Sequence, residues 1–177
     1  MMLAAAIVAA FGQAGCNSIR APDNGGTDSH RTETRATGGN TKTTGRVCQL
    51  LQDDNPNRGG RKVVYRCNGR AVLASDEAKR LLNPSVPVSF GGSGSVVQSN
   101  LITRQAANAT GKSDETACER AFINAAHKFQ ATAQSRNANR VSNFHSYYNR
   151  KILRGGQYDC EVGTFHARVV MRGDIAR

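Results

Sequence analysis

Five cysteines in a chain of 177 residues constrain this sequence more than any other feature. Cys16 stands directly behind an apolar N-terminal run, and the other four, Cys48, Cys67, Cys118 and Cys160, lie further along the chain. In an exported chain an even number of cysteines favours disulfides, and two bonds would each contribute about 2–4 kcal/mol. The spacing disfavours a zinc site, because the sequence has no Cys-x-x-Cys pair. The four cysteines therefore predict a small domain held by two disulfides.

The sequence leaves all three pairings of these four cysteines open. Cys48 and Cys67 flank a hairpin-like unit, residues 46–70, with a polar turn in its middle. A bond between them would close this hairpin at little entropic cost. Cys118 falls in a predicted helix and Cys160 in a predicted late strand, so a second bond between these two would join helix to sheet.

The N-terminal segment, residues 1–11, is an uninterrupted apolar run. It is too short to cross a bilayer as a helix, which needs about 20 residues, but it has the length of the apolar part of a signal peptide. In Gln13-Ala14-Gly15-Cys16, which follows, Ala-Gly-Cys matches the end of a lipoprotein signal box, where the Cys thiol receives the lipid. We therefore expect a signal peptide at 1–15 and lipidation of Cys16. Asn17 is not the Asp that marks inner-membrane retention, so we expect an anchor in the outer membrane, on its periplasmic face.

An alternative start to the mature chain remains open. No Lys or Arg precedes the apolar run, and Gln13 stands where Leu, Val or Ile is usual. Ordinary cleavage after Ala14 would release a soluble periplasmic or secreted protein instead.

Residues 16–45 predict a flexible tether. They are rich in Asn, Gly, Thr, Ser and Arg, and beyond Ile19 they contain no Leu, Ile, Val, Phe or Tyr. Such a segment cannot bury enough apolar surface to offset its ordering entropy. It would link the anchor to a folded domain at 46–177, made of the hairpin unit and a core at 71–177.

The net charge of +11 lies entirely on the mature part, because residues 1–19 carry no charge. Arginine binds phosphate and carboxylate groups in a bidentate manner. One expectation is therefore an anionic ligand, such as a lipid headgroup, lipopolysaccharide or another polyanion. We expect no binding to a specific nucleic acid. A basic but inert surface explains the same charge, since net charge governs solubility and association rather than fold.

Residues 113–135 predict the main helix. Ser113 is a good N-cap, and Asp114 and Glu115 place negative charge on the first turn. Small or apolar residues then recur with helical spacing, at Cys118, Phe122, Ala125, Ala126, Phe129 and Ala133. Residues 71–82 predict a shorter helix that Ser75 caps, with its two leucines, Leu81 and Leu82, facing the core.

Strands dominate the remainder of the chain. Residues 140–148 predict a strand with Val141, Asn143, His145 and Tyr147 on one face. After an exposed loop, residues 158–162 and 164–172 predict two more strands or one long strand bulged at Gly163. Four residues of the last strand should share one face, namely Phe165, Ala167, Val169 and Met171. The expected fold class is α+β, with one main helix packed on a small antiparallel sheet behind a disordered tether.

Several stretches of residues 71–174 carry a resemblance to a known family. They include Asp114-x-x-Ala117-Cys118, Ala121-Phe122, Asn137-Ala138-Asn139-Arg140-Val141, Ser146-Tyr147-Tyr148, Tyr158-x-Cys160-x-x-Gly163 and Val170-Met171-Arg172-Gly173-Asp174. Together they resemble small bacterial envelope proteins that often carry the label "excinuclease ATPase subunit". More distantly, the order of elements is similar to the domain of the outer-membrane stress-sensing lipoprotein of the Rcs system. The resemblance implies a compact α+β domain in which Cys118 and Cys160 are bonded, and it supplies no catalytic residue.

The strongest candidate for a binding surface is an aromatic and basic cluster. Tyr147 and Tyr148 stand close to Arg150, Lys151 and Arg154 in the sequence. Such a cluster can stack on a ligand or hold phosphate. The alternative is a tyrosine edge of the core beside a solvated loop.

The sequence gives little support to catalysis. It has no G-x-x-x-x-G-K-[ST] loop, and the Gly-rich residues 91–95 lack the lysine that such a loop needs. His145 and His166 across two strands would need a third metal ligand, which is not evident. Ser146 with His145 and Asp159 lacks the strained turn that exposes a hydrolase nucleophile. We therefore expect no enzyme, no cofactor and no metal.

These observations predict a non-enzymatic envelope lipoprotein, an interaction or sensory module that binds another envelope component. Two alternatives remain open at this stage. One is a structural subunit of an outer-membrane secretion machine, and the other is a secreted polyanion- or nucleic-acid-binding protein, whose affinity would fall steeply with salt.

Overall fold

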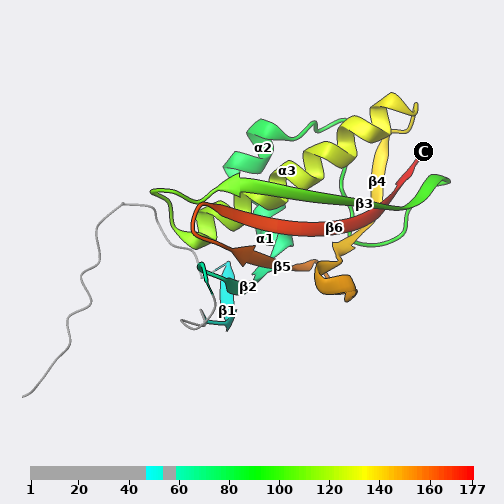
Figure 1. The fold of residues 1–177 in the computed structure, drawn as a ribbon. Helices are drawn as coiled ribbons and strands as arrows, with labels where there is room; N and C mark the ends of the chain where they lie inside the picture. The colour runs from blue at the N-terminus through cyan, green and yellow to red at the C-terminus, as the bar shows by residue number, and fades with distance from the viewer. Residues whose placement is uncertain (1–46, 54–58) are drawn as a thin grey trace, which may run out of the picture. The chain divides into compact units, whose positions relative to one another are not determined.

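The computed structural model describes residues 47–53 and 59–177, which fold as an α+β domain (Figure 1). The expected signal peptide at 1–15, the lipidation site Cys16 and the tether at 16–45 lie outside the described residues. The predicted fold class is confirmed, because one long helix packs on a small antiparallel sheet.

The sheet has six strands, and its central member is β6. Five strands follow one another in the order β1 (Cys48–Gln52), β2 (Val63–Asn68), β5 (Gln157–Val162), β6 (His166–Ala176) and β3 (Val96–Asn108). The sixth strand, β4 (Arg140–Ser146), also pairs with β6. Because β3 occupies the other side of β6, β4 and β5 lie end to end along the same side. The chain between them, residues 147–156, therefore loops out of the sheet and contains the short 3-10 helix η1 (Tyr148–Arg150).

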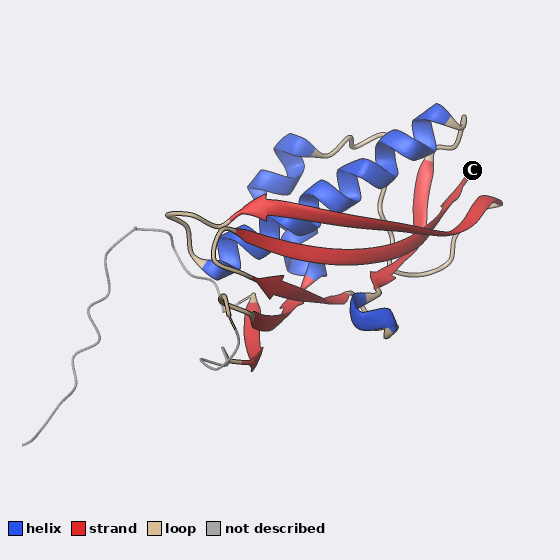
Figure 2. Ribbon diagram, in the orientation of Figure 1, coloured by secondary structure: helices blue, strands red, loops and turns tan. Residues whose placement is uncertain are grey.

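The helices α1 (Gly69–Ala74), α2 (Asp76–Leu81) and α3 (Asp114–Ser135) all lie on one face of the sheet (Figure 2). Side-chain caps begin two of them as predicted, but the single helix expected over 71–82 is divided into α1 and α2 at Ser75, which ends one helix and caps the next. Ser113 Oγ accepts a hydrogen bond from Thr116 N at 3.1 Å at the start of α3, and Ser75 Oγ accepts one from Ala78 N at 3.2 Å at the start of α2. None of these three helices covers the opposite face, which we call the open face.

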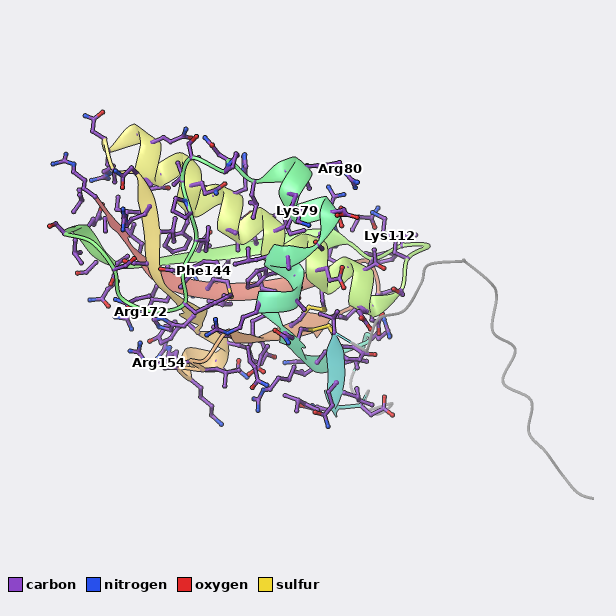
Figure 3. All side chains as sticks on the ribbon, turned by 180° about the vertical axis from the view of Figure 1, so that it is seen from behind. Lys79, Arg80, Lys112, Phe144, Arg154 and Arg172 are labelled. Carbon is purple, nitrogen blue, oxygen red and sulfur yellow. A yellow bond between two sulfur atoms is a disulfide. The ribbon has the colours of Figure 1, made fainter. Side chains whose placement is uncertain are left out.

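Aromatic rings fill the space between α3 and the sheet. The Phe122 ring stacks on Tyr158 with centroids 4.4 Å apart and meets Phe144 edge-on at 5.5 Å. Phe129, which follows Phe122 along α3, also contacts Phe144, with ring centroids 5.2 Å apart. Figure 3 labels Phe144 in a view from the helical side of the sheet. Alanines on the same side of α3 are fully buried and let the helix lie close to the strands.

The structure resolves the cysteine pairing. Cys48 is bonded to Cys67 across the β1–β2 hairpin, with their Cα atoms 4.0 Å apart. Cys118 of α3 is bonded to Cys160 of β5, with Cα atoms 5.8 Å apart and no exposed surface on either residue. The second bond therefore joins the helix to the sheet, as the family resemblance implied.

Two expectations within the strands are wrong, and one alternative that the sequence left open is decided. The predicted alternation in 140–148 breaks at Asn143, whose φ of 49° creates a bulge opposite β6, so Val141 and Phe144 both join the core. Of the two alternatives for residues 158–172, two separate strands are confirmed: Gly163 lies in the turn between β5 and β6, where its N–H donates to His166 O at 2.9 Å. Phe165 belongs to that turn and is 63% exposed instead of sharing the buried face.

Two further differences concern the region before α3. Residues 96–108 form the longest strand of the sheet, β3, where the sequence suggested no regular element. Leu81, expected to face the core, is largely exposed because α2 ends there, whereas Leu82 packs against the core.

Candidate functional site

The open face of the sheet is basic along β6. Ala167, Val169 and Met171 are buried on the α3 side. Side chains alternate along a strand, so Arg168 and Arg172 point to the open face, with Val170 between them.

The neighbouring strand β3 adds a third arginine to the open face. Directly opposite residues of an antiparallel pair share a face. Arg104 lies opposite Val170, and Ala106 lies opposite Arg168. A groove of about 350 Å³ forms at this point; we call it the basic groove, and it is lined by Arg104, Gln105, Ala106, Tyr148, Glu161, Arg168 and Val170.

The acidic side chain of the basic groove is already engaged. Glu161 Oε2 accepts a hydrogen bond from the Tyr148 hydroxyl at 2.7 Å and pairs with Lys62 Nζ at 3.3 Å. Burial would raise the pKa of Glu161, but these hydrogen bonds and the charges of Lys62 and Arg168 outweigh it and lower the pKa. Burial and the bond to Glu161 raise the pKa of Tyr148 to about 12. At neutral pH Glu161 is therefore ionised and Tyr148 is a fixed donor.

The two arginines of the basic groove have no such partner. Within residues 47–53 and 59–177, neither Arg104 nor Arg168 forms an ion pair or a side-chain hydrogen bond. Glu161 lies opposite Arg168 across β5 and β6 and offsets one of the two charges, so the two guanidinium groups leave the groove with a net positive charge. Two such groups in the lining of one groove can hold a carboxylate or a phosphate by charge-assisted hydrogen bonds.

The structure brings together only part of the cluster that the sequence singled out. Tyr148 lines the basic groove, and the ring of Tyr147 lies under the Arg172 guanidinium, with Cζ 5.2 Å from the ring centroid. The remaining three basic residues are exposed on the 147–156 loop and do not line the groove, namely Arg150, Lys151 and Arg154. Sequence reasoning missed Arg104, Arg168 and Arg172; the alternation of basic with buried residues over 167–172 was the available signal.

A buried carboxylate fixes the strands beside this face. Asp174 accepts hydrogen bonds from the backbone N–H of Asn100 at 2.7 Å and from Asn143 Nδ2 at 2.6 Å. Both asparagines have positive φ, 60° and 49°, at irregularities of β3 and β4. Two bulged strands are thereby tied to the same residue of β6, which sets the position of β3 relative to β4.

His145 is buried beside this carboxylate and opposite Arg172. Its Nδ1 lies 2.5 Å from the Asn143 carbonyl oxygen and donates to it, while Nε2 has no partner among the described residues. Burial lowers the pKa of His145, and the charges of Arg154 and Arg172 lower it further, against the Asn143 hydrogen bond and Asp174, which raise it.

This lowered pKa predicts a loss of stability at mildly acidic pH. Below the ordinary histidine pKa of 6.5, the unfolded chain takes up a proton at His145 while the folded chain does not. The free energy of unfolding should therefore fall as the pH decreases through 6.5, until the folded histidine is protonated too. Urea unfolding of the wild type and of His145→Gln from about pH 7.5 to about pH 5 measures this dependence. Equal slopes in the two proteins would contradict the assignment.

Other sites weighed from the sequence do not assemble. His145 lies opposite Arg172 and His166 opposite Asn108, so the two histidines do not face each other. Ser146 is fully buried, and its Oγ accepts a hydrogen bond from Asp159 N at 3.1 Å. Across the described residues, no group of three or more His, Cys, Asp or Glu side chains is placed to hold a metal ion.

A larger cavity of about 630 Å³ lies between β1 and the start of α3, and its acidic groups are engaged in holding the hairpin. Asp114 binds Arg61 and the Tyr65 hydroxyl, and Glu115 Oε1 accepts from Val47 N. Both acidic side chains of this cavity therefore already have hydrogen-bonding partners, whereas the arginines of the basic groove have none among the described residues.

Comparison of the chain with protein-family models, with curated proteins and with solved structures gives no match. The family resemblance described from the sequence motifs therefore stays a prediction. In residues 47–53 and 59–177, no helix has both the length and the hydropathy to span a membrane.

Proposed function

We propose that this chain is an exported, non-enzymatic binding module that Cys16 anchors to the outer membrane, and that it holds an anionic group of another envelope component on the open face of its sheet. One observation carries the binding part: Arg104 and Arg168 flank a groove without any ion-paired partner among the described residues. Two disulfides in a small domain support an oxidising compartment.

The chemistry of the basic groove favours binding over catalysis. Its two groups with perturbed pKa values, Tyr148 and Glu161, are hydrogen-bonded to each other. Their pKa values are shifted away from neutrality, one to about 12 and the other below its ordinary value. General acid–base catalysis needs a group that exchanges protons near the working pH. Tyr148 and Glu161 are therefore held in place as part of the groove lining, where they can orient a ligand beside the arginines.

The anion-binding test uses the full chain with Cys16→Ser, so that no acyl chain contributes, and pyrophosphate as the probe. We expect the amide resonances of Arg104, Arg168 and Tyr148 to shift on titration. The double variant Arg104→Ala/Arg168→Ala should bind at least about tenfold more weakly, since a hydrogen bond to a charged group is worth about 1.5–3 kcal/mol.

The matched control removes two arginines elsewhere. Arg80 and Arg136 are exposed on the helical side, so Arg80→Ala/Arg136→Ala changes the net charge equally. Equal weakening in both double variants would show that net charge alone attracts the probe. The anchor is tested separately on the unmodified chain: the intact mass should lack residues 1–15 and include an acyl group at Cys16, and a mature chain without it would contradict that part.

A further inference from the structure

We propose that the outer edge of β3 accepts an extended segment of a partner protein in which carboxylate side chains alternate with apolar ones. The inference rests on the proposed function, because it names the partner of the same basic groove. It adds a statement about backbone pairing that anion binding alone does not require.

The backbone register of β3 leaves one edge of the sheet unpaired. Ala109 N donates to Phe165 O at 2.8 Å, and the same antiparallel register pairs Ala107 with Ala167. Odd-numbered residues of β3 are therefore bonded to β6, and the even-numbered ones direct their N–H and C=O groups outward. The Ala106 carbonyl agrees with this assignment, because Asn124 Nδ2 of α3 reaches it at 3.0 Å.

The unpaired edge is long and lightly protected. In the described part of the chain no hydrogen bond reaches the outward groups of Ile102 and Arg104. The 13-residue strand contains no lysine or proline and a single charged residue, Arg104. Ile102 is 48% exposed, and Val96 and Val97 are also exposed. Native sheets usually block such an edge with charge, proline or a covering segment, so a bare one is a template for strand addition.

Different surroundings flank this edge on its two sides. On the open face lies the basic groove with Arg104 and Arg168. On the helical side lies a small cavity of about 90 Å³ between β3 and α3, lined by Leu101, Ile102, Thr103, Lys128, Phe129 and Thr132. Side chains of an added strand alternate between the two sides. Those on the open face would meet unpaired guanidinium groups, and those on the helical side would meet a mostly apolar lining.

Charge complementarity selects the occupant. A second copy of this chain would bring its own basic open face against Arg104 and Arg168, which like charges disfavour. A lipid headgroup would satisfy the arginines but would leave the outward backbone groups of Ile102 and Arg104 unused. An acidic extended segment satisfies both sets of groups at once.

The experiment uses the full chain with Cys16→Ser and a six-residue peptide of alternating Glu and Val. Binding of the peptide is measured by fluorescence anisotropy. We expect binding of this peptide and at least about tenfold weaker binding of the Lys-Val peptide of the same length. A Glu-Val peptide that is N-methylated at alternate residues should also bind at least about tenfold more weakly, because it cannot complete the ladder.

A backbone variant of the protein tests the edge from the other side. Ile102→Pro removes an outward N–H and keeps both arginines, and proline is tolerated where an edge N–H faces solvent. It should weaken peptide binding at least about tenfold and leave pyrophosphate binding unchanged. Ile102→Thr, which keeps the N–H, is the matched control and should bind the peptide almost as well as the wild type.

The outcomes separate this inference from the proposed function. If N-methylation leaves peptide affinity unchanged, strand addition is wrong, even if the groove still binds pyrophosphate. Suppose that Arg104→Ala/Arg168→Ala leaves pyrophosphate affinity unchanged, while Ile102→Pro still weakens binding of the Glu-Val peptide. Strand addition at the edge of β3 would then be supported and the proposed anion site would be wrong. Equal affinity for the Lys-Val peptide, or tight binding only to vesicles of anionic phospholipid, overturns the acidic protein segment as the occupant.

Discussion

Replacing Cys118 and Cys160 together by alanine is expected to lower the free energy of unfolding by about 4 kcal/mol. The bond joins residues 42 apart in sequence, and a long loop loses much entropy in the unfolded chain when it is closed. The bond also lies inside the core, because both cysteines are fully buried where α3 packs against β5. Without it, the helix is held on the sheet by side-chain packing alone.

Urea unfolding of the double variant and of the wild type measures this loss. The Cys48–Cys67 bond provides the comparison, because it spans 19 residues and links two strands that already pair. Its removal should cost about 3 kcal/mol and should leave the near-UV signal of the aromatic core in place. A change below about 1 kcal/mol on removing the Cys118–Cys160 bond would mean that this bond contributes little to stability.

Truncating Phe122 to alanine is expected to cost about 3–5 kcal/mol. Its ring is fully buried and contacts the rings of Phe90, Phe144 and Tyr158 at centroid distances of 6.4, 5.5 and 4.4 Å. Phe144 and Tyr158 are held on strands of the sheet, so these rings cannot move in to fill the cavity completely. Aromatic contacts add to the loss, because edge-on and offset pairs contribute beyond the area they bury.

The control for this prediction is Phe165→Ala. The same atoms are removed, but Phe165 is 63% exposed in the turn before β6. Its loss should change the free energy of unfolding by less than about 0.5 kcal/mol. Similar changes in the two variants, measured by urea unfolding, would contradict the burial of Phe122 in the core.

The parts of the fold that sequence reasoning predicted are those with local signals. The start of α3 was predictable because Ser113 and the acidic residues after it form a cap within one turn. The β1–β2 hairpin was predictable because its two strands are close in the sequence. The even number of cysteines indicated two bonds, but their pairing needed the family resemblance as well.

The strand β3 shows where such signals end. Its apolar residues stand in adjacent pairs, at 96–97, 101–102 and 106–107, instead of alternating with polar ones, and a Gly-rich stretch precedes it. Its conformation depends on pairing with β6, more than 50 residues later, and strand propensity is dominated by such context. The bulge at Asn143 is equally non-local, because Asp174 of β6 binds the asparagine side chain.

In the candidate site too, residues that are adjacent in the sequence were predictable and residues that only strand pairing brings together were not. Tyr147 and Tyr148 were found because they are adjacent, but the basic neighbours that followed them in sequence remained on the exposed loop. Of the two arginines that line the groove with Tyr148, Arg104 comes from β3 and Arg168 comes from β6. Only the register of β3 on β6 places these side chains together.

The end-to-end arrangement of β4 and β5 along β6 has a practical consequence. The backbone closes again below the 147–156 loop, because Ser146 and Leu153 exchange hydrogen bonds in both directions at 3.0 and 3.2 Å. The tip, which includes Arg150 and Lys151, contributes nothing to the register of either strand. The tip can therefore be lengthened, or a reporter inserted there, beside the open face and without a change in the strand pairing underneath.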